Sequence, residues 1–79
     1  MMSAAALAPM PLDSTLLARA TYRPSSSLLD LEFRNGAIYR YFAVPAATYQ
    51  GLLAADSKGS YFNLQIRDGF QYALLRRPR

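Results

Sequence analysis

The sequence predicts an α+β fold: a three-stranded antiparallel meander, one or two short helices packed on one face, and a closing C-terminal strand. The main observation is a strand–turn–strand pattern over residues 28–45. Leu29, Leu31 and Phe33 alternate with charged residues, and Asn35-Gly36 then gives a strong hairpin turn signal. Helical spacing follows over residues 46–53, and alternation returns near the C-terminus. We therefore expect one β-hairpin to organise the rest of the chain.

Two turn geometries are open to this hairpin. A two-residue loop would place Leu31 opposite Arg40, whereas a type I turn with Gly36 as a bulge would place Leu31 opposite Tyr39. We choose the bulged register because it separates apolar from charged side chains and sets Asp30 opposite Arg40. The predicted core face is Leu29, Leu31, Phe33, Tyr39 and Tyr41, and the predicted outer face is Asp30, Glu32, Arg34, Ile38, Arg40 and Phe42.

The other elements are assigned in chain order. Residues 1–12 are rich in small residues and prolines and are predicted to form a flexible leader. Residues 13–22 are predicted to form the first strand, with Leu16, Ala18, Ala20 and Tyr22 in the core and Leu17 facing outward. Pro45 ends the hairpin and suits the first turn of a helix.

A second short helix is predicted from Ser60, its capping residue, to Arg67. The closing strand is expected over residues 70–75, and residues 76–79 form a basic, solvated tail.

Composition excludes several classes of function. Seventy-nine residues make one domain, and a chain that is 52% hydrophobic and 18% charged is expected to fold. There is no Cys or His, and the five carboxylates are scattered, so we expect no disulfide, metal site, cofactor or catalytic centre. No segment approaches the ~20 apolar residues that span a membrane, so we expect a cytoplasmic protein without a membrane partner.

The net charge is +4, but its distribution is uneven. Arg76, Arg77 and Arg79 lie in the last four residues and leave six basic and five acidic residues in the body. A basic tail therefore describes the chain better than a uniformly basic protein does.

One ordered set of residues points to a known family. It consists of Phe33, Gly36, Tyr39-Arg40-Tyr41, Val44-Pro45, Tyr49, Ser57, Gly59, Tyr61-Phe62-Asn63 and Ile66-Arg67. With these features the chain resembles the KTSC domain, a small bacterial domain also found at the C-terminus of some lysyl-tRNA synthetases. The resemblance assigns residues 13–75 to a single KTSC-like domain. Fusion to a tRNA synthetase implies RNA binding by association. Arg23 departs from the pattern, because an Asp often follows the strand Tyr there.

The residue types suggest where a nucleic acid could bind. Arg19 and Arg40 point outward in the chosen register beside Phe42, which could stack a base. The turn Ser57–Ser60, with Lys58 before a helix start, could hold a phosphate. The tentative nucleic-acid-binding set is Arg19, Arg40, Phe42, Lys58, Ser60, Arg67, Arg76 and Arg77.

Each of these sites has a plainer structural interpretation. Tyr39 and Tyr41 could also stack bases, although core packing is favoured for both. The turn at Lys58 is more simply a capped loop, and Arg67 is more simply an ion-pair partner. We therefore predict a small non-enzymatic binding module for RNA or another nucleic acid. The alternative is a protein-interaction or self-association module, favoured by Leu17, Ile38 and Phe42 as exposed apolar residues on the sheet.

Overall fold

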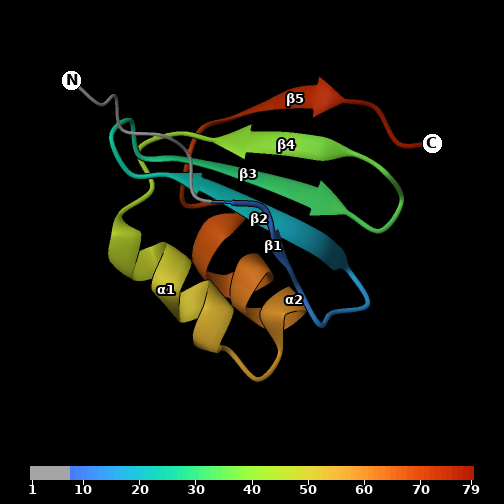
Figure 1. The fold of residues 1–79 in the computed structure, drawn as a ribbon, viewed down its shortest axis with the longest axis horizontal. Helices are drawn as coiled ribbons and strands as arrows, with labels where there is room; N and C mark the ends of the chain where they lie inside the picture. Colours follow the sequence, from blue (N-terminus) through green and yellow to red (C-terminus); the bar gives the residue numbers. More distant parts are fainter. Residues whose placement is uncertain (1–7) are drawn as a thin grey trace.

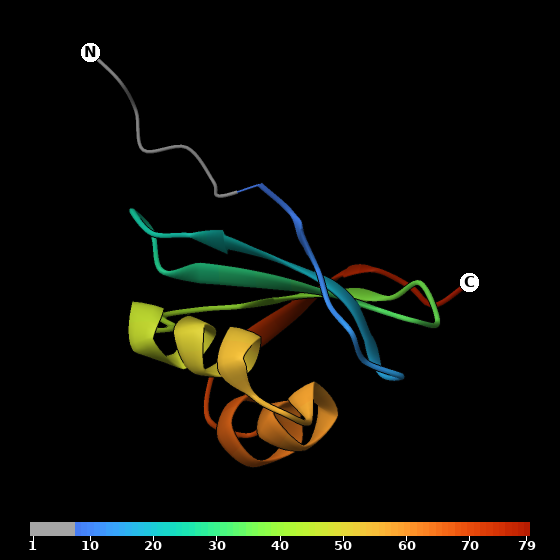
Figure 2. The same cartoon turned by 60° about the horizontal axis from the view of Figure 1, so that its bottom comes forward.

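A computed structural model describes residues 8–79 as one antiparallel sheet with helices on a single face (Figure 1). The strands, in their order across the sheet, are Met10–Pro11 (β1), Leu17–Arg23 (β2), Leu28–Phe33 (β3), Ile38–Tyr41 (β4) and Tyr72–Arg76 (β5). The helices are Ala46–Ala54 (α1) and Lys58–Tyr61 (α2), and α2 continues into a π-helical turn, Phe62–Ile66 (η1). Figure 2 shows the helical layer beneath the sheet, and no helix of residues 8–79 lies on the opposite, outer face. The predicted α+β class is confirmed. The meander contains one strand more than predicted, the edge strand β1.

The bulged register of the central hairpin is confirmed. Gly36 has φ +92°, its N–H donates to the Phe33 carbonyl at 2.9 Å, and the Phe33 N–H donates to the Ala37 carbonyl at 2.8 Å. Leu31 lies opposite Tyr39, and Asp30 lies opposite Arg40. The positive φ is a conformation that glycine adopts without the clash of a Cβ atom. The turn therefore fixes which side chains face the helices and which face solvent.

The predictions for the leader and the first strand need correction. Met10–Pro11 pairs with β2, and Leu12 is buried, so residues 10–12 of the predicted leader of residues 1–12 belong to the fold. Residues 1–7 of that leader lie outside the described residues. Leu17 was expected on the outer face but is fully buried. A bulge between Leu17 and Arg19 is the reason, because it shifts the alternation before Ala20 and Tyr22 continue on the core side.

The core lies between the sheet and the helices. Tyr49 and Leu52 of α1 are fully buried, and the ring of Tyr49 stacks on Tyr22 with centroids 4.8 Å apart. The Tyr22 hydroxyl donates to the Val44 carbonyl at 2.6 Å. The buried cluster is completed by Leu12, Leu17, Ala20, Leu29, Leu31, Tyr41, Val44, Phe62 and Ile66. None of the helices within residues 8–79 has the length and apolar character needed to cross a membrane.

The structure also differs from the predicted start of the second helix and from the predicted start of the C-terminal tail. The capping residue of α2 is Ser57, whose Oγ accepts the Ser60 N–H at 3.2 Å, so Ser60 is inside the helix. The predicted tail of residues 76–79 is partly integrated into the fold. Arg76 is the last residue of β5, opposite Ile38, and the Arg79 N–H donates to the Asn35 carbonyl at 2.8 Å.

Gly36→Ala should lower the free energy of unfolding by about 1 kcal/mol or more, because a Cβ is strained at positive φ. It would also fall 2.6 Å from Cγ of Arg79, which packs over the turn. Urea denaturation of the variant measures this loss.

The matched control for this prediction is Gly59→Ala in α2. Its Cβ would meet Leu16 at 3.6 Å, an ordinary contact, and alanine favours a helix by about 0.5–1 kcal/mol over glycine. Equal stability of the Gly36→Ala variant and wild type would contradict the role assigned to the turn.

Candidate functional site

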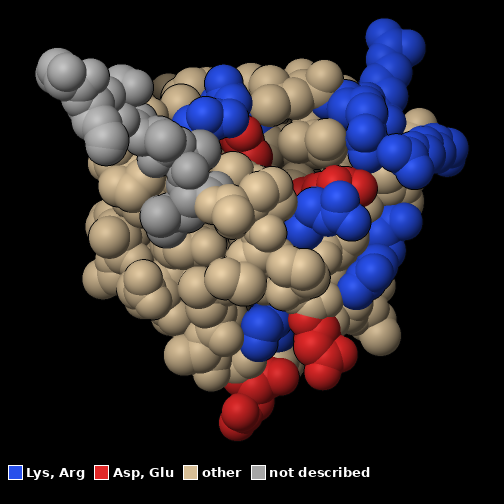
Figure 3. All heavy atoms as spheres, in the orientation of Figure 1, with Lys and Arg blue, Asp and Glu red and all other residues tan. Residues whose placement is uncertain are grey.

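Positive charge gathers where the β3–β4 turn and the C-terminus meet. Five arginines lie there, and we call them the basic end: Arg19, Arg34, Arg76, Arg77 and Arg79. Three facts place them together. Arg19 and Arg76 flank Glu32 and Ile38 in one cross-strand row, Arg34 belongs to the turn, and Arg79 packs on Gly36. Figure 3 shows blue side chains gathered on this side of the molecule.

Counting side chains, the basic end accounts for the entire excess charge of the chain. Five arginines and one carboxylate, Glu32, give +4, which is the formal net charge of all 79 residues. The four remaining basic residues are balanced by four remaining acidic residues. The molecule is therefore electrically one-sided, which composition alone does not reveal.

Contacts with the fold hold several of these arginines in place. Glu32 lies between Arg19, at 3.6 Å, and Arg76, at 3.3 Å. Arg76 Nε also donates to the Gly36 carbonyl at 2.8 Å. Arg34 donates from Nε to the Ser14 carbonyl and from a terminal nitrogen to the Leu12 carbonyl, both at 3.0 Å. These contacts leave the guanidinium groups at the surface in restricted positions, whereas Arg77 has no ion-pair partner among residues 8–79.

Arg40 and Phe42, two of the predicted contacts, lie outside this group. Arg40 makes two hydrogen bonds to Asp30, at 2.8 and 2.9 Å, and these bonds raise the pKa of Arg40 further above its ordinary value. Arg23 approaches the same carboxylate at 3.8 Å. Phe42 is 39% exposed and follows the end of β4 that is away from the turn. The structure thus brings Arg19, Arg76 and Arg77 of the predicted set together at the basic end. Arg40 lines the same outer-face hollow as Arg19 and Arg76 but is paired with Asp30, and Phe42 lies away from them.

Lys58 and Ser60 lie in the short helix α2, apart from the basic end. Lys58 Nζ donates to the Ala55 carbonyl at 2.9 Å, and the hydroxyls of Ser57 and Ser60 bond each other at 3.0 Å. Asp13 and Asp56 line the same hollow. The polar groups of this turn are thus engaged with one another, and two carboxylates make the hollow unfavourable for an anion.

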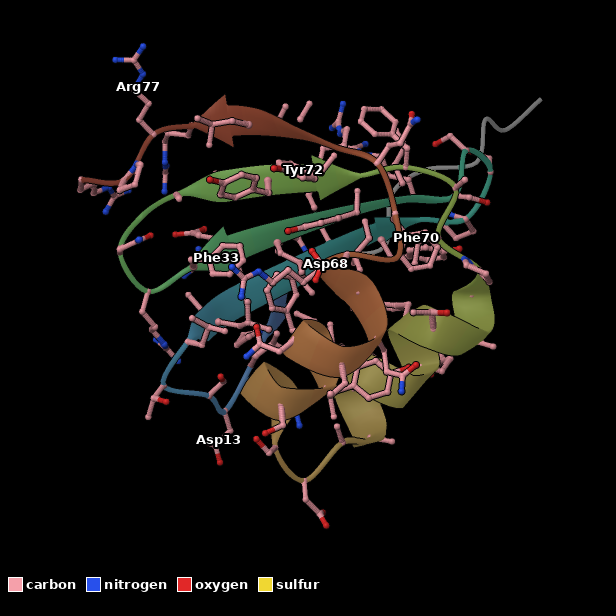
Figure 4. All side chains as sticks on the ribbon, turned by 180° about the vertical axis from the view of Figure 1, so that it is seen from behind. Asp13, Phe33, Asp68, Phe70, Tyr72 and Arg77 are labelled. Carbon is pink, nitrogen blue, oxygen red and sulfur yellow. The ribbon has the colours of Figure 1, made fainter. Side chains whose placement is uncertain are left out.

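Five aromatic rings line a groove on the helix side of the sheet, and we call it the aromatic groove. Each ring contacts the next in a closed circuit, with centroids 5.3–5.8 Å apart, in the order Phe33, Tyr39, Tyr72, Tyr41 and Phe62. The groove has a volume of about 460 Å³ and lies between β4–β5 and the η1 segment (Figure 4). The sequence predicted Tyr39 and Tyr41 as core residues but gave no signal that the rings would border an open space.

The π-helical turn brings Arg67, the last residue of the predicted set, to this groove. The Arg67 N–H donates to the Phe62 carbonyl five residues earlier, at 2.9 Å, so the two residues are one wide turn apart and both line the groove. Asn63 and Asp68 lie at the same rim. Arg67 was expected to form an ion pair, but it makes none among residues 8–79. π-helical turns are often found at functional sites.

The described part of the chain offers no cluster of acidic residues that could bind a metal ion. What it offers chemically is concentrated positive charge at the basic end and aromatic faces in the groove.

Comparison with known proteins places this architecture among its relatives. Residues 13–70 match the family model of the KTSC domain. An uncharacterized protein of Stutzerimonas stutzeri is 48% identical over 52 residues, which are 66% of this chain and 73% of that protein. A lysine–tRNA ligase of Nostoc sp. is 44% identical over 54 residues, which are 68% of this chain but only 10% of the ligase. A crystal structure of a KTSC domain protein from Yersinia pestis is 28% identical, with a TM-score of 0.85 over 91% of this chain and 100% of that one.

Tyr41 should ionise at a higher pH than an exposed tyrosine does. Burial, with smaller effects from Tyr39 and Tyr72, raises the pKa of Tyr41 to about 12. In the unfolded chain a tyrosine ionises near pH 10. Because the folded pKa is the higher one, the stabilisation is complete below about pH 10 and is lost as pH rises towards 12.

Tyrosinate absorbance tests this assignment. The difference between the titrations of wild type and Tyr41→Phe should have its midpoint near pH 12, as long as the protein remains folded. A difference curve centred near pH 10 would show that the floor of the groove is open to water.

Proposed function

The chain belongs to the KTSC domain family, and from this premise we propose that it is a small non-enzymatic module that binds RNA through the phosphates at its basic end. The observation that carries this proposal is the placement of the whole +4 excess charge at one end of the molecule. The chain has no Cys or His, so the proposal includes no catalytic step.

The arrangement of the arginines suits phosphate better than a diffuse positive surface would. A guanidinium group presents a planar fork of donors that matches phosphate oxygens. Contacts to Glu32 and to backbone carbonyls restrict Arg19, Arg34 and Arg76, so less side-chain entropy is lost on binding. A net charge of +4 supports only modest affinity, and that affinity should fall as salt increases.

Similarity to a segment of a lysine–tRNA ligase favours RNA over other polyanions as the ligand. A related segment forms about a tenth of a lysine–tRNA ligase, a protein named for a reaction on tRNA. This support is associational, because the relationship covers the segment and not the ligase.

Self-association is a second candidate function, favoured by the edge strand β5. Tyr72, Leu74 and Leu75 are 58%, 46% and 48% exposed, and the far side of β5 has no strand paired with it among residues 8–79. Such an edge is a template for pairing with another chain. The irregularity between Ile38 and Tyr39 in the β4–β5 ladder shortens the regular part of this edge, so we rank the candidate second. Leu17, one of the three residues first cited for this function, is buried and does not contribute.

Neutralising two arginines of the basic end should reduce the salt dependence of RNA binding. The test variant is Arg77→Gln with Arg79→Gln, which keeps the aliphatic part of Arg79 over Gly36. Each phosphate neutralised on a single strand contributes about 0.7 to the slope of log K against log salt, so the slope should fall by about 1.4 if both arginines contact phosphates. Fluorescence anisotropy with a single-stranded RNA at several salt concentrations measures it.

The control for this measurement removes the same charge elsewhere. Arg23→Gln with Lys58→Gln alters the balanced remainder of the molecule and should leave the slope unchanged. Thermal unfolding of both variants checks that each is folded. Equal effects of the two pairs, or no RNA affinity at low salt, would contradict the proposal.

If β5 mediates self-association, Leu74→Lys should abolish it. Sedimentation of the wild type should give an average mass that rises from 8.8 kDa towards twice that value as concentration increases, whereas the variant stays monomeric. Leu64→Lys is the control, because Leu64 is 81% exposed but lies on η1, away from the edge. A constant monomer mass for the wild type would exclude this candidate.

A further inference from the structure

The aromatic groove has walls that solvent can reach and a floor that it hardly reaches. Tyr41 and Phe62 are 4% and 5% exposed and form the floor. Tyr72 is 58% exposed, Tyr39 is half-buried, and both line the same space. The rings of Tyr39 and Tyr72 meet at 61° with centroids 5.6 Å apart. A flat apolar ring entering the groove would therefore find two accessible aromatic faces at an angle to each other.

The hydroxyl groups of these tyrosines remain available for a ligand. Tyr22 and Tyr61, outside the groove, donate to the backbone carbonyls of Val44 and Thr48. The hydroxyls of Tyr39, Tyr41 and Tyr72 make no such bond within residues 8–79, although a buried tyrosine usually finds a partner. Hydroxyl groups of this kind can donate to or accept from the polar edge of a bound ring.

The rim of the groove is polar but carries no net charge. Arg67 and Asp68 provide one charge of each sign, and Asn63 provides an amide donor and acceptor. Arg67 opposes binding of a cation against the rings, and Asp68 opposes binding of an anion in the same place. The rim suits a neutral flat ring with hydrogen-bond donors and acceptors on its edge, which is the chemistry of a nucleobase.

The groove also adjoins the basic end. Phe33 and Leu16 line the groove, and Arg34 directly follows Phe33, with its N–H donating to the Leu16 carbonyl at 2.9 Å. A strand whose phosphates lie on the basic end could therefore turn a base into the groove. We propose that the aromatic groove binds one unpaired nucleobase, so that the module selects single-stranded over double-stranded RNA. This inference rests on the proposed function and names the class of RNA that it takes.

The test compares a single-stranded oligoribonucleotide with the same sugar–phosphate chain lacking bases and with a duplex. The groove variant is Tyr72→Leu, which keeps an apolar side chain on an exposed position; Tyr72→Phe restores the ring. The matched control is Phe42→Leu, which removes an exposed ring outside the groove.

Stacking on an aromatic side chain corresponds to roughly 5- to 150-fold in affinity per base. We expect Tyr72→Leu to weaken binding of the single strand by that factor without changing the salt slope, because stacking releases no counterions. Tyr72→Phe and Phe42→Leu should bind nearly as wild type, and the abasic chain and the duplex should bind wild type as weakly as the single strand binds Tyr72→Leu.

The outcomes separate this inference from the proposed function. Equal affinity for the single strand, the abasic chain and the duplex would overturn the groove site while RNA binding stands. A loss of affinity confined to Phe42→Leu would place stacking on the outer face and would overturn the groove site too.

If no RNA binds at low salt, the proposed function fails, and a nucleoside titration then tests the groove alone. Adenosine or guanosine should shift the amide resonances of Asn63, Arg67 and Tyr72; no shift, or a shift with tetramethylammonium instead, would overturn the inference.

Discussion

The β3–β4 turn is the constraint on which the rest of the molecule depends. With Gly36 at positive φ, the hairpin pairs Leu31 with Tyr39 and Asp30 with Arg40, and a slip of one residue would reverse every side chain of β4. The same turn also receives the C-terminal segment, since the carbonyls of Gly36 and Asn35 accept hydrogen bonds from Arg76 and Arg79. One local conformation thus sets the core face and also gathers arginines from distant parts of the chain.

Electrostatics divides the outer face of the sheet into two parts with different properties. Near its middle, Asp30 binds Arg40 through two short hydrogen bonds and attracts Arg23, so much of the charge of those arginines is compensated. Nearer the turn, the single carboxylate of Glu32 serves both Arg19 and Arg76. Clustered like charges oppose folding, and exposed ion pairs stabilise little. The arginines of the basic end therefore contribute little to stability, and the proposed binding of an anionic partner would give them a role.

The extent to which sequence predicted this structure follows the range of the interactions. The hairpin was predictable because alternation and an Asn-Gly turn are local signals, and Tyr49 and Leu52 followed from helical spacing. The burial of Leu17 was not, because a bulge against β3 shifts its strand, and the edge pairing of Met10–Pro11 gives almost no local pattern. For the site, the sequence predicted arginines as candidate phosphate contacts from their chemistry alone. The structure was needed to show which arginines share a carboxylate across strands and which gather near the β3–β4 turn. The groove could not be predicted because it depends on the π-helical turn that sets Phe62 and Arg67 on one face.

The position of the aromatic residues is the strongest indication that the helix-side groove is more than a surface irregularity. The chain has ten aromatic residues, and five of them line the groove. A domain of this size buries a smaller fraction of its surface than a large one, so rings are valuable in its core. The core is closed elsewhere by aliphatic residues and by the stacked pair of Tyr22 and Tyr49. Tyr72 is largely exposed beside four more buried rings, so apolar burial is given up at this position. The accessible ring faces, and the hydroxyls that make no hydrogen bond within residues 8–79, are suited to a flat ligand with a polar edge.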